Sequence, residues 1–220
     1  FVAGTISYPN ADNSESTADK RFWVSGNNNQ TKTLCSKDTA TTGFNGSACA
    51  KLQGKKAFNV FAAGNLFAGV MEFDSNTLGK GYARFGHKYT YTARPSAMRI
   101  HINGTPGSGD YSRIYFCIVD WSERHTVISG LSSDASTFWS PLKQSSVAEG
   151  AILGYGLLDI TASTNGWTTV TLPVHWYDTA TKPATGNYSI VISAAASAEG
   201  DYMKGSTDSV LCIEDFEWIY

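Results

Sequence analysis

The feature that most constrains this chain is a two-residue alternation of apolar and polar side chains, in short runs separated by glycine- and serine-rich breaks. Met98, Ile100 and Ile102 alternate with polar neighbours, which is the period of a strand with one buried face. Residues 113–121 are apolar on both faces, as in a central strand. No window of a dozen residues keeps apolar positions at spacings of three and four, so helix is disfavoured. We expect these two strands to form a hairpin about residues 104–109.

Further strands are predicted along most of the chain. Short strands between turns rich in Gly, Ser and Asn are typical of antiparallel sandwiches and barrels. Abundant threonine and a 13% aromatic content also favour pleated sheet. We therefore expect one all-β domain over residues 1–220, an antiparallel β-sandwich. The additional predicted strands are 22–25, 57–61, 66–73, 87–92, 126–129, 151–160, 168–174, 188–193 and 209–218.

The charge pattern excludes two classes of partner. Lys and Arg total 17 against 19 Asp and Glu, with no basic run, so nucleic acid and anionic membrane are not expected partners.

No stretch of the sequence approaches the roughly 18 consecutive apolar residues that cross a bilayer. The first residues are neither an initiator Met nor a charged signal region. We expect a mature domain without its export or lipidation segment and without any preceding domain.

The cysteines show no metal-binding spacing. Cys35, Cys49, Cys117 and Cys212 include no Cys-x-x-Cys pair, which disfavours zinc. Cys35 and Cys49 flank a loop rich in Thr, Gly and Ser and are candidates for a disulfide bond in an oxidising compartment. Four free thiols is the alternative. Cys117 and Cys212 lie in apolar strands and are expected to be buried thiols.

One pair of carboxylates has the spacing of a catalytic pair. Glu72 and Asp74 would point to the same face of a strand, about 6.6 to 7 Å apart. A glycosidase needs two facing carboxyl groups roughly 5 to 9.5 Å apart. A solvated strand edge is the alternative, because Asn76 and Thr77 supply no third acid.

A second pair of carboxylates interrupts the apolar strand at the C-terminus. Strict alternation places Asp215 on the face of Leu211. It places Glu214 on the opposite face, with Phe216 and Trp218. Burying an unpaired carboxylate is costly, so both acids should have partners. Backbone amides, an arginine or a structural calcium ion bound by Asp215 would each serve.

Residues 200–220 resemble the closing motif of the "putative carbohydrate metabolism domain" found in Bacteroides-type cell-envelope lipoproteins. That motif has Gly-Asp followed by Tyr or Phe, a glycine-rich turn, and a strand ending in Asp-Asp and an aromatic residue. Residues 63–69, 85–86 with 94–95, and 110–121 resemble further blocks of the family. This chain departs from the pattern at Glu214, which replaces the first Asp.

The resemblance implies a β jelly roll that handles glycans at the bacterial surface. It implies a cell-envelope location, outer-membrane-anchored and surface-exposed or periplasmic, and partners among other envelope glycan-uptake proteins.

A sugar site needs aromatic rings that stack on pyranose faces and polar side chains that hydrogen-bond hydroxyl groups. Asp201 and Tyr202 lie between Gly200 and Gly205 and combine both properties. The stacking candidates are Trp23, Phe67, Trp139 and Tyr202, and the hydrogen-bonding candidates are Asn65, Arg94 and Asp201.

Three functions remain open at this point. The leading hypothesis is a glycan-binding or glycan-processing accessory domain of a bacterial surface lipoprotein involved in carbohydrate utilisation, with a polysaccharide or oligosaccharide as its partner. The first alternative is a glycoside hydrolase or lyase that uses Glu72, Asp74 or Asp201. The second is a structural or protein-interaction domain with all its aromatic residues in the core. No cofactor is required by any of them, apart from the structural calcium considered for Asp215.

Overall fold

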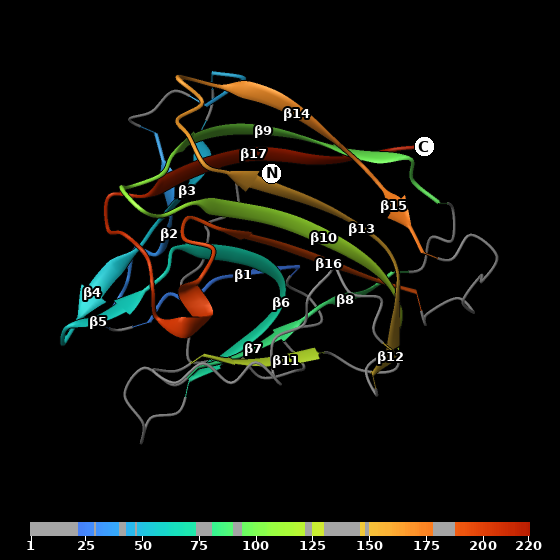
Figure 1. The fold of residues 1–220 in the computed structure, drawn as a ribbon, viewed down its shortest axis with the longest axis horizontal. Helices are drawn as coiled ribbons and strands as arrows, with labels where there is room; N and C mark the ends of the chain where they lie inside the picture. The colour runs from blue at the N-terminus through green and yellow to red at the C-terminus, as the bar shows by residue number, and fades with distance from the viewer. Residues whose placement is uncertain are drawn as a thin grey trace.

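The chain folds into antiparallel β-strands with one short 3-10 turn, η1 (Gly200–Tyr202), among the residues described (Figure 1). In a computed structural model of the chain we describe residues 22–28, 30–39, 43–46, 48–73, 81–89, 94–121, 125–129, 146–147, 150–177 and 188–220. No helix in these ranges has the length and apolar character to span a membrane. The strands are β1 (Trp23–Val24), β2 (Cys35–Asp38), β3 (Cys49–Gln53), β4 (Lys55–Ala57), β5 (Val60–Ala62), β6 (Asn65–Phe73), β7 (Gly81–Phe85), β8 (His87–Tyr89), β9 (Ala97–Thr105), β10 (Ser112–Trp121), β11 (His125–Ser129), β12 (Ser146–Val147), β13 (Gly150–Ile160), β14 (Thr168–Pro173), β15 (His175–Trp176), β16 (Tyr188–Ala195) and β17 (Val210–Ile219).

Two sheets pack face to face. The larger has the order β11-β7-β6-β16-β10-β13-β12, with β1 beside β6, β8 beside β16 and β15 beside β13. The smaller has the order β14-β9-β17-β3-β2, and β4 and β5 form a separate hairpin. In Figure 1, β14, β9 and β17 run above β13, β10 and β16. The prediction of an all-β antiparallel sandwich is confirmed.

The connections between strands cross repeatedly from one sheet to the other. β9 lies in the smaller sheet and β10 in the larger, and the steps from β13 to β14 and from β16 to β17 also change sheet. This alternation gives the jelly-roll topology. It also shows that the predicted hairpin about residues 104–109 is wrong, because the loop there carries the chain between sheets. The apolar–polar alternation of a strand does not show which other strand it pairs with.

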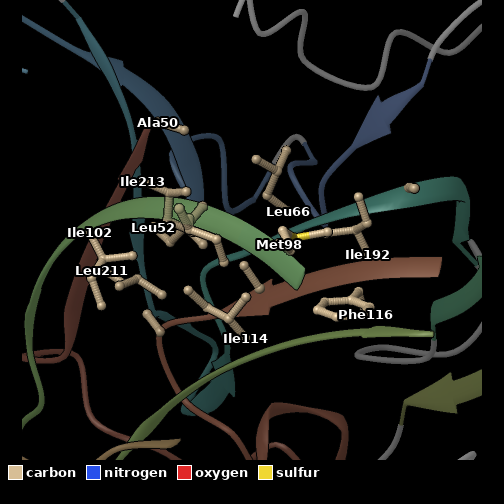
Figure 2. Packing of buried hydrophobic residues seen from close by; sticks show 14 of the residues in the cluster. Ala50, Leu52, Leu66, Met98, Ile102, Ile114, Phe116, Ile192, Leu211 and Ile213 are labelled. Atoms are coloured by element: carbon tan, nitrogen blue, oxygen red, sulfur yellow. The ribbon is translucent and has the colours of Figure 1, made fainter. Parts of the chain in front are cut away.

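The main core lies between the two sheets (Figure 2). Leu52, Met98 and Leu211 of the smaller sheet face Ile114 and Phe116 of the larger, and each is at most 1% exposed. Burying an aliphatic or aromatic side chain of this size contributes roughly 1.5 to 3 kcal/mol. Burial of these side chains therefore joins the two sheets.

A β-bulge changes which side chains of the last strand, β17, face the core. Strand β17 shifts register against β9 between Glu214 and Phe216, and Asp215 adopts a left-handed φ of 52°. Phe216 and Trp218 consequently pack on the same core as Leu211. Strict alternation through this strand is therefore wrong beyond Glu214, because the bulge inserts one residue and re-phases the apolar side chains.

The Cys35–Cys49 disulfide prediction is also wrong. Cys35 pairs with Leu52 across β2 and β3, and both side chains face the main core. Cys49 pairs with Asp38 and, three residues from Leu52, points to the opposite face of the sheet. All four cysteines are free and buried, as expected for Cys117 and Cys212.

Candidate functional site

Two of the predicted stacking residues serve the interior. The Trp23 ring lies 4.9 Å from Phe216, centroid to centroid, and packs on the main core. Phe67 is only 2% exposed and lies 4.8 Å from the Phe85 ring. Phe67 therefore offers no ring face to a ligand, which corrects its assignment as a sugar-stacking residue. Its apolar neighbours became apparent only once strand pairing was known.

The predicted hydrogen-bonding residues Asn65 and Arg94 already have partners in the protein. Asn65 Oδ1 accepts a 2.7 Å hydrogen bond from the Gly26 amide, which fixes the segment after β1. The Arg94 guanidinium lies 4.7 Å from the centroid of the Trp176 ring. Both contacts position neighbouring segments, and they bring neither residue to Asp201.

Three predicted positions cannot be placed. Trp139 and Asp74 lie outside the described residues. Glu72 belongs to β6 by its backbone, and its side chain lies outside the described part. The spacing of the Glu72–Asp74 pair therefore stays a prediction.

Asp201 and Tyr202 lie in η1, the orange-red coil of Figure 1. Glycine is required at both ends of this turn. A Cβ on Gly200 would come within 2.3 Å of the Ala63 Cβ, and one on Gly205, whose φ is +150°, within 2.5 Å of Ser197. Close packing at these two glycines, against Ala63 on one side and against Ser197 and Phe61 on the other, fixes the path of the chain on both sides of Asp201.

Asp110, which we did not predict as a site residue, fixes the loop that carries η1. Its Oδ2 atom accepts hydrogen bonds from the Ser197 hydroxyl at 2.6 Å, the Ser206 amide at 2.9 Å and the Ser209 hydroxyl at 2.6 Å. These donors bracket η1 on both sides. The sequence could have indicated this role, because Asp110 directly follows a Gly-Ser-Gly turn and begins the block 110–121 that resembles the family. Asp110 is thus a positioning residue for Asp201.

The electrostatic environment of Asp201 is unusual for a surface turn. Burial raises the pKa of its carboxyl from 3.8 to about 6. Its charge also contributes to the raised pKa of Tyr115, for which burial is the main cause. The Tyr115 side chain hydrogen-bonds Ser193 on the adjacent strand β16. A carboxyl group that titrates near pH 6 can accept or donate hydrogen bonds under mildly acidic to neutral conditions.

Tyr115 faces away from the smaller sheet, on what we call the outer face of the larger sheet. Strand β13 brings Tyr155 to the same face, because Tyr155 pairs with Cys117, two residues along β10 from Tyr115. Tyr155 then meets His175 and Tyr177, with centroid separations of 5.2 and 5.4 Å. His175 is exposed and the two tyrosines are half-buried.

This aromatic group of Tyr155, His175 and Tyr177 was not predicted from the sequence. The Tyr177 hydroxyl hydrogen-bonds Tyr155, and the His175 and Tyr177 rings lie 5.1 Å apart, nearly perpendicular. The i, i+2 spacing of His175 and Tyr177 was a usable signal for a shared face. Their proximity to Tyr155 depends on the pairing of β15 with β13.

A charged pair completes the polar part of the outer face. Arg113 Nε and Nη2 donate to Asp159 Oδ1 and Oδ2 at 2.6 and 2.8 Å, a bidentate ion pair between β10 and β13. Arg113 lies two residues from Tyr115 and so shares its face. The hydrogen bond to Asp159 raises the pKa of Arg113, and the pair is fixed in geometry.

The acids of the C-terminal strand have the partners that their burial demands. Glu214, 4% exposed, accepts the Phe44 backbone N–H, and Asp215 Oδ2 accepts the Asn45 side-chain amide at 3.2 Å. The prediction that these carboxylates are partnered is confirmed. Within the described ranges, no three His, Cys, Asp or Glu side chains gather into a metal-binding group. Asp215 is thus accounted for by its amide partner and the bulge.

The molecule is a jelly-roll sandwich with tyrosines and a histidine on one outer face and the half-buried Asp201 carboxyl group near Tyr115. A family model described as "Putative carbohydrate metabolism domain" matches residues 4–219, and the chain belongs to this family. The family predicted from the closing motif is confirmed.

Two solved structures share the fold. A protein named as a putative glycoside hydrolase from Bacteroides thetaiotaomicron has a TM-score of 0.64 and 22% identity, over 90% of this chain and 62% of that one. Another of the same description from Bacteroides vulgatus has a TM-score of 0.63 and 18% identity, over 90% of this chain and 85% of that one. This chain therefore spans less than two thirds of the first protein. Curated proteins gave no significant match.

Proposed function

We propose that this domain binds a polysaccharide or oligosaccharide on the outer face of its larger sheet. The observation that carries the proposal is the group formed by the rings of Tyr155, His175 and Tyr177, of which His175 is exposed. Membership of a carbohydrate-related family supports a sugar as the ligand.

The chemistry of the face suits a neutral, hydroxyl-rich ligand. The apolar side of a pyranose stacks on an aromatic ring, and tyrosine hydroxyls and carboxyl oxygens hydrogen-bond its hydroxyl groups. Asp201 and Tyr115 provide such groups on the same sheet face as Tyr155. The net charge of -2 gives no strong field that would favour an ionic ligand instead.

A binding measurement with matched aromatic variants tests the proposal. The chain would be titrated with a panel of soluble plant and microbial polysaccharides by calorimetry or affinity electrophoresis. Tyr155→Ala and Tyr177→Ala should each weaken binding about tenfold or more, since stacked rings carry much of such affinity. Phe58→Ala is the control, because Phe58 is 74% exposed at the β4–β5 turn and belongs to no part of this face. Equal losses in all three variants, or no glycan bound, would reject the proposed site.

A glycoside hydrolase is the second candidate, and the raised pKa of Asp201 favours it. A general acid in such enzymes needs a pKa near the working pH, and burial supplies one of about 6 here. Glu72 and Asp74 remain proposals for the second carboxyl group. Release of reducing ends from a polysaccharide panel, abolished by Asp201→Asn, would assign catalysis. Binding without release would assign an accessory domain.

We also propose a location in the bacterial cell envelope alongside other glycan-uptake proteins. The family membership supports this proposal. Fractionation of a bacterium that expresses the full-length protein, with protease shaving of intact cells, would test it. Recovery in the cytosolic fraction would reject it.

A further inference from the structure

Cys49 and Cys212, far apart in the sequence, lie on neighbouring strands of the smaller sheet. Cys212 on β17 pairs with Lys51 on β3, and Cys49 is two residues from Lys51 on the same strand. Residues two apart on a strand point to the same face. Both thiols therefore lie on the face directed away from the main core, in diagonal positions across two bonded strands.

The two side chains are in direct contact. The Cys49 thiol donates a hydrogen bond to the Cys212 sulfur, and this contact lowers the pKa of Cys212 while raising that of Cys49. Burial and the Asp38 charge oppose this lowering of the Cys212 pKa, and the Lys51 charge adds to it. Cys212 is thus the better nucleophile of the pair, and Cys49 stands beside it as a second thiol.

A loop covers this face next to the thiols. The Phe44 amide donates to Glu214, and the Phe44 ring stacks on His101 with centroids 3.8 Å apart. Cys49 and Cys212 are 3% and 4% exposed. Phe44 itself is 41% exposed, so this loop lies at the protein surface. Local opening of this loop would give an oxidant access to the sulfurs.

We propose that Cys49 and Cys212 form an intramolecular disulfide bond when the protein meets a disulfide oxidant, so that β3 is covalently joined to β17. The inference rests on strand register and thiol contact, and it is independent of any glycan site. It replaces the Cys35–Cys49 pairing, which opposite faces of the sheet forbid.

The chemistry is thiol–disulfide exchange in two balanced steps. The Cys212 thiolate attacks one sulfur of a low-molecular-weight or protein disulfide, forming a mixed disulfide and releasing one thiolate. Cys49 then loses its proton to solvent and attacks Cys212 Sγ, which expels the second thiolate. The protein pair is oxidised by two electrons and the oxidant is reduced to two thiols. Closing from hydrogen-bond contact to an S–S bond of about 2.05 Å requires rotation of both side chains and a small strand adjustment.

Oxidation of the intact chain with oxidised glutathione, followed by alkylation and peptide mass spectrometry, tests the proposal. We expect a loss of two hydrogen atoms and one cross-linked peptide pair containing Cys49 and Cys212. The thermal midpoint should rise on the order of 5 to 15 °C and return after dithiothreitol, because the bond closes a very long loop.

Variants separate the two thiols from the others. Cys49→Ala and Cys212→Ala should each abolish the cross-link, while Cys35→Ala and Cys117→Ala should keep it. The wild-type peptide map decides the question even if a variant folds poorly. A cross-link through Cys35 or Cys117 would overturn the proposal. So would a folded chain that stays reduced, or stops at the mixed disulfide, in conditions that oxidise the urea-unfolded chain.

Discussion

The Ser209 hydroxyl donates a 2.6 Å hydrogen bond to Asp110 Oδ2, which joins the residue before β17 to the loop before β10. The same oxygen accepts from Ser197 and Ser206. Asp110→Asn should lower the free energy of unfolding by about 2 to 4 kcal/mol, because hydrogen bonds to a charged acceptor are strong and the amide cannot accept all of them. Urea denaturation would measure the loss. Asp208→Asn, on an exposed neighbour in the same turn, should change stability by less than about 0.5 kcal/mol. Similar values for both variants would contradict the role of Asp110.

Asp201→Asn should stabilise the protein at neutral pH. A folded-state pKa of about 6 against 3.8 means that the folded state favours the protonated carboxyl. The stability that this group contributes is complete below pH 3.8 and is lost as the pH rises through 6. Above pH 6 the charged Asp201 costs about 1 to 3 kcal/mol, which the neutral amide avoids.

Unfolding midpoints at pH 4 and pH 8 would check the Asp201 prediction. The variant should gain stability at pH 8 and little or nothing at pH 4. A gain that is equal at both pH values would show that the substitution acts by packing and not through the carboxyl charge. Loss of glycan binding in the same variant would mark Asp201 as a residue retained at a cost in stability.

The bulge at Asp215 gives predictions for the deletion of this residue and for its substitution. Removing Asp215 would leave Glu214 opposite His101 and Phe216 opposite Ile100 in a regular ladder, so Phe216 and Trp218 would still face the core and the variant should fold. Asp215→Gly keeps the extra residue and suits the φ of 52°, so it should change the unfolding free energy by no more than about 1 kcal/mol. Near-ultraviolet circular dichroism would report the packing of Trp218. A deletion variant that does not fold, or that folds without the native tryptophan signal, would refute this account.

Gly205→Ala should displace η1. Its Cβ would lie 2.5 Å from Ser197 and 2.6 Å from Phe61, at a φ of +150°. The expected cost is above about 2 kcal/mol, with weaker glycan binding because Asp201 moves. Gly166→Ala is the matched control, since its φ is +122° and no atom lies within 4 Å of the added methyl group. It should show the backbone cost alone, about 1 kcal/mol, with binding unchanged. Equal costs would mean that the close contact at Gly205 is unimportant.

Local patterns predicted the strands because alternation is a property of each strand by itself. Residues predicted at 113–121 and 151–160 became β10 (Ser112–Trp121) and β13 (Gly150–Ile160). Pairing could not be predicted, because β9 and β10 are adjacent in sequence yet belong to different sheets. Asp201 was found in the sequence through its glycine-bounded turn. The partners of Tyr155 were missed, because the register of β15 against β13 brings them together.

The sequence by itself determined the fold class, the position of most strands and the family, since each depends on short-range periodicity or on motifs a few residues long. The tertiary structure alone decided that Phe67 is core, that Cys49 meets Cys212 and that Asp110 holds the turn of Asp201. Each of these depends on contacts between segments far apart in the chain. The register of strand pairing sets which side chains of a strand face the core. A single inserted residue such as Asp215 moves the residues that follow it to the opposite face.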